Sequence, residues 1–356
     1  MVRLLTLILG PPLIVGLAYL LARPDVPRSA WPWPAPSTVA NAAELPIVQP
    51  PRPPVPGVGD SSDAALVSAC QRKREDLMRR LGTRFFSIVH TPFVIVGDVP
   101  AAELERHYRE TIGPTARALA IAYFDRPPSE PVSLILLSGD EAYQSCVEQL
   151  DGQKRPAFAG YYERSDHRIV VNAATGEGTI AHELTHALGH FDFPDMPEWF
   201  DEGLASLHEE ARFSDDRLRI TGTKNWRIRY LLPALRQGTL RPLESLIGEA
   251  RVRPNQQAVD YAHARFFCLF LQERGLLEPF YRKFRLAVAG DPTGSRTLHA
   301  LFNVNDLGPI DQEFRSWVLA LERPTVRAIV PEPVPAAESG RDGRPRSSDK
   351  KPAGEP

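Results

Sequence analysis

The sequence predicts an α+β fold with two unlike parts. Between residues 85 and 171, short apolar runs such as 132–137 are bounded by turn residues, which is typical of buried strands. Segments with helical periodicity alternate with these strands, at 62–81, 101–122 and 140–150. From residue 197 onward nearly every segment has helical periodicity. We therefore expect an N-terminal part of mixed sheet and helix, a mostly helical C-terminal part, and a functional site where the two meet.

Composition divides the chain into four segments. Proline is abundant, with 35 residues in 356, and it is concentrated near the two ends. We expect a hydrophobic targeting segment at 1–22, an extended proline-rich linker at 23–62, a folded domain at 63–323 and a disordered tail at 324–356. A folded segment of about 260 residues can form one large domain or two lobes that share a cleft.

The N-terminal segment predicts an association with a membrane. Residues 4–22 contain no charge and follow Arg3, and a membrane-spanning helix needs about 20 apolar residues. The segment is either a signal peptide or an uncleaved anchor. We favour the anchor, because the flank Arg23-Pro24-Asp25 lacks a small-x-small cleavage site. The folded domain is then expected outside the cytoplasm, held at the membrane, or secreted if the segment is cleaved.

Charge and cysteine content exclude several classes of function. The formal net charge is −2, with 24% charged and 43% hydrophobic residues. This balance provides no basic field for nucleic acid, so no nucleic-acid partner is expected. The three cysteines permit at most one disulfide, and their spacing resembles no metal site. We expect them to be buried free thiols.

The segment 179–189 carries the chemistry of the chain, because it contains the pattern HExxH. Residues four apart share one face of a helix, so His182 and His186 can present two imidazoles to one zinc ion. Glu183 is positioned to hold and deprotonate a zinc-bound water. We expect a helix over 179–188, with Gly189 as its C-terminal stop.

A catalytic zinc takes three protein ligands and keeps one position open. Two carboxylates compete for the third place. Glu202 lies between bulky apolar residues on a second helix opened by Pro197, just before Gly203, where two helices could approach closely. An unpaired carboxylate in that setting would be costly. Asp192 instead continues the first motif as HExxHxxGxxD and would return to the metal after a turn at Gly189.

The sequence HELTHALGH followed by PEWFDEGLA resembles the gluzincin metallopeptidases, the peptidase MA-like group. The similarity covers about residues 155–210, with a weaker similarity over 261–275. The residues that match the family pattern are His182, Glu183, His186, Glu202, Gly203 and Ala205. The resemblance implies a zincin-like fold, zinc as the cofactor, and Glu202 rather than Asp192 as the third ligand. It departs at Asp201, where aminopeptidase relatives carry asparagine, and no exopeptidase motif is present.

Further residues have expected roles around the metal. Tyr261 is the candidate donor to the oxyanion, from its family-like position, although a half-buried helix tyrosine is the plainer interpretation and Tyr230 is a second candidate. His263 is expected in the core. His190 is expected at the end of the motif helix or beside the ligands rather than among them. Glu198 and Asp201 are expected either to support the ligands or to be solvated.

These features predict a zinc metallopeptidase that acts on a peptide or protein substrate, with Glu183 as general base. The alternative is a non-catalytic, membrane-tethered zincin-like domain that serves as a binding or scaffold module. Glu183 favours the enzyme, because a structural zinc site usually closes with four ligands and needs no base. A zinc hydrolase for a non-peptide bond is a third interpretation that the residues do not separate from the first.

Overall fold

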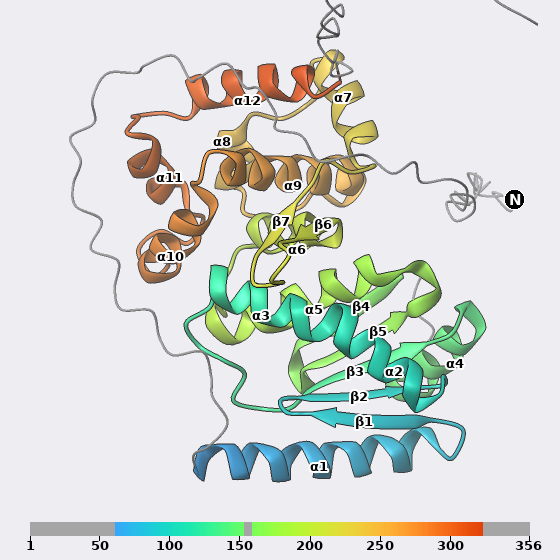
Figure 1. The fold of residues 1–356 in the computed structure, drawn as a ribbon. Coiled ribbons are helices and arrows are strands. Elements are labelled where there is room, and N and C mark those ends of the chain that lie inside the picture. The colour runs from blue at the N-terminus through green and yellow to red at the C-terminus, as the bar shows by residue number, and fades with distance from the viewer. Residues whose placement is uncertain (1–60, 153–158, 323–356) are drawn as a thin grey trace, which may run out of the picture. The chain divides into compact units, whose positions relative to one another are not determined.

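The computed structural model describes residues 61–152 and 159–322. The expected N-terminal targeting segment, nearly all of the proline-rich linker and the C-terminal tail lie outside these residues. In the described part of the chain, no helix combines the length and the apolar character needed to cross a membrane. The architecture is α+β, as the sequence predicts, with a sheet-containing N-terminal part followed by a mostly helical C-terminal part (Figure 1).

A five-stranded sheet organises the N-terminal part, in the order β1-β2-β3-β5-β4. Its three central strands run parallel, while β1 and β4 pair antiparallel at the two edges. The strands are β1 Phe86–His90, β2 Phe93–Gly97, β3 Val132–Leu137, β4 Gly160–Glu163 and β5 Arg168–Asn172. The central strands are continuous runs of buried residues, which is expected for strands covered on both faces. The strand predicted at 132–137 is therefore confirmed as β3.

Helices cover both faces of this sheet. They are α1 Ser61–Leu81, α2 Ala101–His107, the π-helical turn η1 Tyr108–Ile112, α3 Gly113–Ala122 and α4 Asp140–Asp151. Alternate strand residues face opposite sides. Val94 and Ile135 belong to a core cluster with residues of α1 and α4. Ile95 and Leu134 belong to a second cluster with residues of α3 and of α5 (Glu177–Asp192). Figure 1 shows α1 against the outer side of the sheet.

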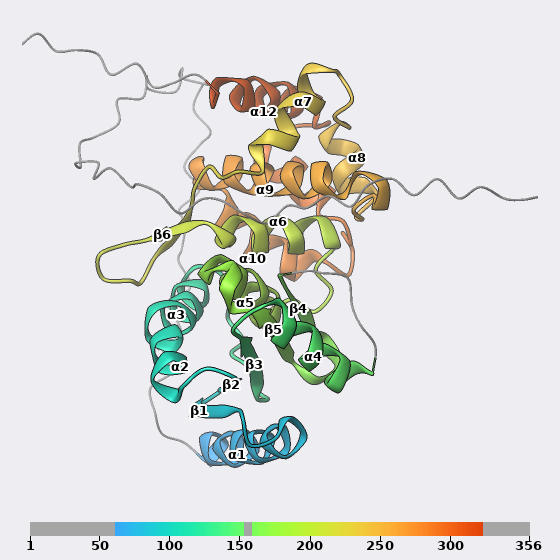
Figure 2. The same cartoon turned by 90° about the vertical axis from the view of Figure 1, so that its right-hand side faces the viewer.

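The C-terminal part stacks helices on the motif helix α5 (Glu177–Asp192). Helix α5 packs between the sheet and α6 (Glu198–Glu209), and α6 packs in turn against α9 (Gln257–Glu273) (Figure 2). The remaining elements are β6 Ala211–Phe213, β7 Ile220–Gly222, α7 Ile228–Arg236, α8 Leu243–Gly248, α10 Leu277–Ala287, α11 Ser295–Phe302 and α12 Gly308–Ala320. The motif helix therefore lies where the sheet-containing part meets the helical part.

Three details differ from the prediction. Helix α5 does not stop at Gly189 but continues to Asp192. Gly189 does not adopt the positive φ of a glycine cap, and its carbonyl accepts the N–H of Phe193. The β6–β7 hairpin and helix α8 were not expected, since strands of three residues and a helix of six are too short for a periodic signal.

The N-terminal end of α5 is tied to α2 and η1 through Glu177. Its carboxylate accepts a 2.5 Å hydrogen bond from Thr111 and pairs with His107 Nδ1 at 2.9 Å and with Arg106 at 3.2 Å. Burial favours the neutral carboxyl, but these three partners outweigh burial and lower the pKa of Glu177 to about 2. This cluster fixes where the motif helix begins relative to the sheet.

Candidate metal centre

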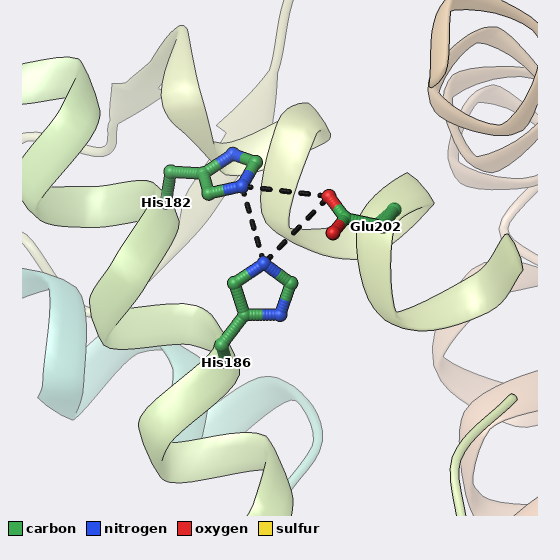
Figure 3. Close-up of side chains that lie close together, drawn as sticks. All are labelled: His182, His186 and Glu202. Atoms are coloured by element: carbon green, nitrogen blue, oxygen red, sulfur yellow. Dashed lines mark hydrogen bonds and ion pairs between the residues drawn. The ribbon is translucent and has the colours of Figure 1, made fainter. Parts of the chain in front are cut away.

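Two helices bring three potential metal ligands together. His182 and His186 lie one turn apart on α5, and their Nε2 atoms are 3.1 Å apart. Glu202 reaches them from α6, with Oε2 at 3.6 Å from Nε2 of His182 and 3.7 Å from Nε2 of His186 (Figure 3). The three atoms form a triangle whose members converge on one point. In the described part of the chain, this is the group that could hold a metal ion.

The size of the triangle suits a first-row metal. A circle through three atoms with these separations has a radius of about 2.0 Å, and zinc binds histidine nitrogen and carboxylate oxygen at about 2.0–2.2 Å. Oε2 of Glu202 is buried and accepts no hydrogen bond from the described residues. Burying a carboxylate oxygen without a hydrogen-bond donor costs folding free energy. Coordination of a cation by Oε2 would remove this cost.

His186 is oriented by a carboxylate on the neighbouring helix. Its Nδ1 hydrogen-bonds Oδ1 of Asp201 at 2.8 Å, and Oδ2 of Asp201 hydrogen-bonds Nε2 of His190 at 3.0 Å. A proton on Nδ1 leaves the lone pair of Nε2 free to face the group. The expectation that Asp201 and His190 lie beside the ligands is consistent with these contacts. Glu198 is the first residue of α6 and accepts the N–H of Val252.

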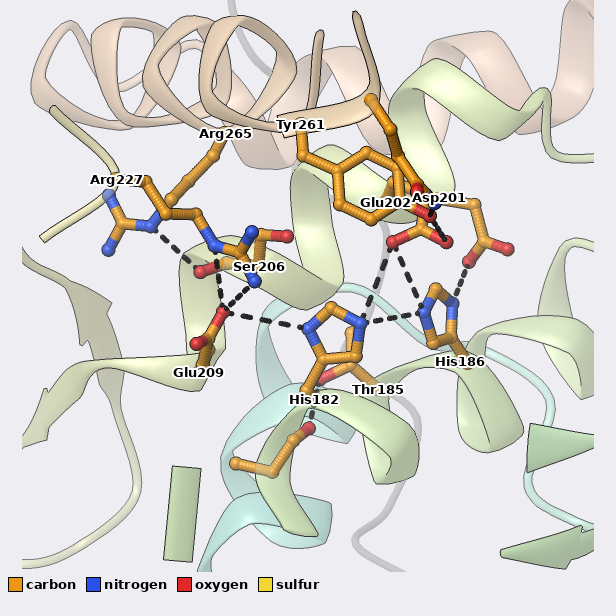
Figure 4. A network of polar contacts seen from close by, with 12 residues as sticks. His182, Thr185, His186, Asp201, Glu202, Ser206, Glu209, Arg227, Tyr261 and Arg265 are labelled. Carbon is orange, nitrogen blue, oxygen red and sulfur yellow. Dashed lines mark hydrogen bonds and ion pairs between the residues drawn. The ribbon is translucent and has the colours of Figure 1, made fainter. Parts of the chain in front are cut away.

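His182 has an outer partner that the sequence analysis did not identify. Oε2 of Glu209 lies 3.9 Å from Nδ1 of His182, and Arg227 holds this carboxylate through Nε at 3.0 Å and Nη2 at 2.7 Å (Figure 4). Glu209 follows Glu202 by seven residues, which is two turns along the same face of α6. That spacing was a signal available in the sequence, whereas the approach of Arg227 was not.

Helix α6 is held in place by α9 through a close contact at Gly203. A Cβ atom there would lie 2.9 Å from Sγ of Cys268 and 3.0 Å from the carbonyl oxygen of Ala264. Arg265 adds a buried hydrogen bond of 2.8 Å from Nε to the carbonyl of Ser206 (Figure 4). The expected close approach of two helices at Gly203 is therefore confirmed, and it positions Glu202 opposite α5.

Glu183 follows His182 on α5 and has no hydrogen-bond partner among the described residues. Its residue surface is 8% exposed. Burial raises the pKa of the Glu183 carboxyl, and the nearby imidazoles of His182 and His186 offset part of this effect. A carboxylate whose proton affinity is raised is suited to accept a proton near neutral pH.

The group has an excess of negative charge that the protein itself only partly neutralises. Burial favours the neutral imidazole, but Asp201 and Glu202 raise the pKa of His186 to about 10. The same interactions act in reverse, since the histidines hold the pKa values of Asp201 and Glu202 below their usual range despite burial. Three carboxylates, Glu183, Asp201 and Glu202, thus lie among three imidazoles, those of His182, His186 and His190. A divalent cation would complete the charge balance.

Tyr261 lies beside the group, as expected for a residue of α9 that faces α6. Its hydroxyl donates a 3.0 Å hydrogen bond to Oε1 of Glu202 and accepts one of 3.2 Å from Gln257 (Figure 4). Burial and the charge of Glu202 raise the pKa of the phenol. The hydroxyl is therefore a protonated donor next to the candidate metal group. Tyr230 does not share this position, because its hydroxyl accepts a hydrogen bond from Arg229 on α7.

Asp192 has a different role from the one that the HExxHxxGxxD spacing suggested. Helix α5 continues past Gly189, and the side chain of Asp192 is buried in a network that does not include the two histidines. Its oxygens accept the backbone N–H groups of Asp125 and Arg126, each at 2.9 Å, and the hydroxyl of Tyr281 at 2.9 Å. It also pairs with Arg285. Asp192 fastens the end of α5 to α10 and to the loop after α3.

Two other expectations concern core residues. His263 is completely buried and stacks on Phe314 at a ring distance of 5.4 Å. Burial lowers its pKa to about 3, so it is a neutral core residue, as predicted. The three cysteines, Cys70, Cys146 and Cys268, are buried free thiols.

No protein-family model matches this sequence, and no curated protein is significantly similar to it. The similarity to the gluzincin pattern therefore depends on the motif residues and on their placement in the structure.

Proposed function

We propose that this protein is a zinc-dependent peptidase whose metal is held by His182, His186 and Glu202. When bound, the ion supplies Lewis acidity, which polarises a carbonyl and acidifies water. Glu183 takes the proton from the attacking water and passes it to the leaving amine. Tyr261, whose hydroxyl donates to Oε1 of Glu202 in this structure, would turn that donor to the reacting carbonyl oxygen.

One observation carries this proposal, namely the placement of Glu183 next to a three-ligand group. Oε2 of Glu202 and two Nε2 atoms form a triangle of suitable size, and Glu183 follows the first ligand on the same helix. Three protein ligands with an adjacent free carboxylate are typical of catalytic zinc sites, whereas structural sites usually carry four ligands. This arrangement supports catalysis over a scaffold role.

The outer residues support the same assignment. Asp201 and Glu209 lie on the far nitrogens of His186 and His182, at 2.8 and 3.9 Å. The hydrogen bond from Asp201 favours the His186 tautomer whose Nε2 binds metal and increases its basicity, whereas Glu209 places a negative charge behind His182 without a hydrogen bond. Chance proximity of histidine and glutamate would not require a carboxylate hydrogen-bonded to the far nitrogen of a ligand ring, as Asp201 is to His186.

We also propose that a peptide or protein is the substrate and that residues 1–22 tether the enzyme to a membrane. The support for the tether is the uncharged segment 4–22 followed by a proline-rich linker. Limited proteolysis of membranes should cut in the linker and release a folded, soluble domain. Recovery of the intact chain in the soluble fraction, with residues 1–22 still attached, would refute the tether.

The test of the function combines metal analysis with digestion of an unbiased peptide library. The wild-type protein should bind about one zinc per chain, because the group has three ligands, and it should cleave library peptides. Glu183→Gln should keep the zinc and the fold while lowering turnover by about 10²–10⁴-fold. Glu141→Gln is a matched control, since Glu141 is an exposed glutamate on α4 and lies outside the group. If Glu183→Gln cleaves peptides as fast as the wild type, the mechanism is wrong.

A further inference from the structure

A basic and aromatic surface lies beside the metal group. It is formed by Lys224, Trp226, Arg229 and Tyr230, at the loop between β7 and α7 and at the start of α7, and we call it the Trp226 surface. Trp226 is 44% exposed. Its ring meets Tyr230 at a centroid distance of 5.9 Å, and the Arg229 guanidinium lies 4.9 Å from both rings. The cation is thus held in place by two aromatic rings.

The surface is continuous with the metal group through Arg227. The guanidinium of Arg227 lies 4.6 Å from the ring of Trp226 and 5.9 Å from the ring of Tyr261. Arg227 also binds Glu209, the carboxylate behind His182, and Tyr261 donates its hydrogen bond to Glu202. A chain of direct contacts therefore leads from the candidate ligands to the Trp226 surface. A peptide bound at the metal would have neighbouring residues within reach of this surface.

The charge of this region is one-sided. Residues 217–243 contain seven lysines and arginines and no aspartate or glutamate. Three of these cations are paired with carboxylates from elsewhere in the fold, namely Arg227 with Glu209, Arg236 with Glu322 and Arg241 with Asp260. Lys224 and Arg229 have no carboxylate within ion-pair distance in the described part of the chain, and Lys224 donates to the carbonyl of Leu321. Arg229 instead donates to the hydroxyl of Tyr230.

We infer that the Trp226 surface binds acidic residues of the substrate next to the bond that is cleaved. The inference rests on the proposed function and adds the class of substrate. Arg229 and Lys224 supply positive charge that the fold does not neutralise, and Trp226 supplies an apolar face for the backbone or an aromatic side chain of the peptide. An exposed tryptophan stacked on an unpaired arginine is typical of a binding surface.

An anionic membrane is the other surface that tryptophan and basic residues commonly contact. The position of the Trp226 surface favours the peptide. Its link through Arg227 reaches both Glu209 and Tyr261, which touch the candidate ligands. A membrane docked there would lie against the reactive centre.

The experiment measures binding separately from cleavage, in the full-length chain. Three pools of fluorescein-labelled peptides share a randomised centre and carry flanks of glutamate, glutamine or lysine. Binding is measured by anisotropy with the zinc-loaded Glu183→Gln protein, which should bind without cleaving. The binding measurement is then repeated with Glu183→Gln proteins that carry Arg229→Ala, Arg229→Glu or Trp226→Ala as a second substitution. Arg79→Ala is the matched control, because Arg79 is an exposed arginine on α1 that pairs only loosely, at 3.6 Å, with Asp76.

Glutamate-flanked peptides should bind more tightly than glutamine-flanked ones. Arg229→Ala should reduce this preference roughly two- to fivefold, the range of one exposed ion pair, and Trp226→Ala should weaken binding of both pools. Arg229→Glu should shift the preference toward lysine flanks, and the control should change nothing. High salt should reduce the preference, because exposed charges are screened.

Two results separate this inference from the proposed function. If the wild-type protein cleaves all three pools equally and Arg229→Ala changes nothing, the inference is overturned and the peptidase stands. If no pool is cleaved, the peptidase proposal fails, while the anisotropy of the glutamate and glutamine pools still decides whether the surface binds acidic peptides. Binding to vesicles that contain phosphatidylserine, lost in Arg229→Ala while peptide binding is unchanged, would assign the surface to a membrane and overturn the inference.

Discussion

Glu202 and Asp192 are the two carboxylates that could complete the metal site, and the structure predicts opposite consequences for their neutral variants. Glu202→Gln removes the charge from the one buried oxygen that faces both Nε2 atoms. Zinc affinity should fall by more than about 100-fold, since loss of an outer partner alone typically costs 10–100-fold. The fold of the metal-free protein should change little, because the amide oxygen can still accept the hydrogen bond of Tyr261.

Asp192→Asn should instead destabilise the protein and leave the zinc in place. Asp192 is fully buried and pairs with Arg285, and removal of one partner of a buried ion pair costs about 3–5 kcal/mol. Arg285 keeps a second carboxylate, Asp125, and the amide oxygen of asparagine keeps part of the acceptor role. We therefore expect a loss of about 2 kcal/mol in the free energy of unfolding, which lowers Tm by about 4–8 °C for a domain of this size.

Two measurements distinguish these outcomes. Zinc affinity is determined by competition with a chromophoric chelator, and Tm is measured with excess chelator so that metal loss does not alter the result. Glu198→Gln is the matched control for the first variant, because Glu198 lies on the same helix and its carboxylate accepts the N–H of Val252. The reasoning is refuted if Asp192→Asn loses zinc at unchanged Tm while Glu202→Gln keeps it.

Three further predictions concern the residues that support the site. Asp201→Asn should lower zinc affinity about 10–100-fold while leaving one metal per chain at saturation, since it removes the charge behind His186; chelator competition measures this, and unchanged affinity would contradict it. The lowered pKa of Glu177 stabilises the fold above pH 4.5, and this contribution is lost as the pH falls toward 2. Denaturant titrations between pH 4.5 and pH 2 should therefore show that the free energy of unfolding of the wild type falls by about 1–2 kcal/mol more than that of Glu177→Gln, a value reduced for partial solvent exposure. Equal pH dependence of the two proteins would contradict this prediction. Gly203→Ala should cost about 1–3 kcal/mol, because its methyl group would lie 2.9 Å from Sγ of Cys268; an unchanged urea midpoint would show that the α6–α9 contact can relax.

The sequence alone determined the features that depend on short-range spacing. The four-residue interval between His182 and His186 places both rings on one helix face, whatever the rest of the fold does. The apolar run at 132–137 likewise predicted a strand, because it is short and bounded by turn residues, and the structure has β3 there. The apolar neighbours of Gly203 predicted a packed second helix, and the α6–α9 contact has this form.

Tertiary structure decided which distant residues meet these local patterns. Residue spacing left both Asp192 and Glu202 as candidates, and the resemblance to the family pattern favoured Glu202. The structure separated them, because α5 continues beyond Gly189 and α6 brings Glu202 to the two histidines. Glu209 precedes the β6–β7 hairpin in the sequence and Arg227 follows it, and the hairpin brings the two side chains together. Its strands of three residues are too short for a periodic signal in the sequence. Helical spacing determines which side chains share a face, but the choice of partner for that face depends on how the whole chain packs its core.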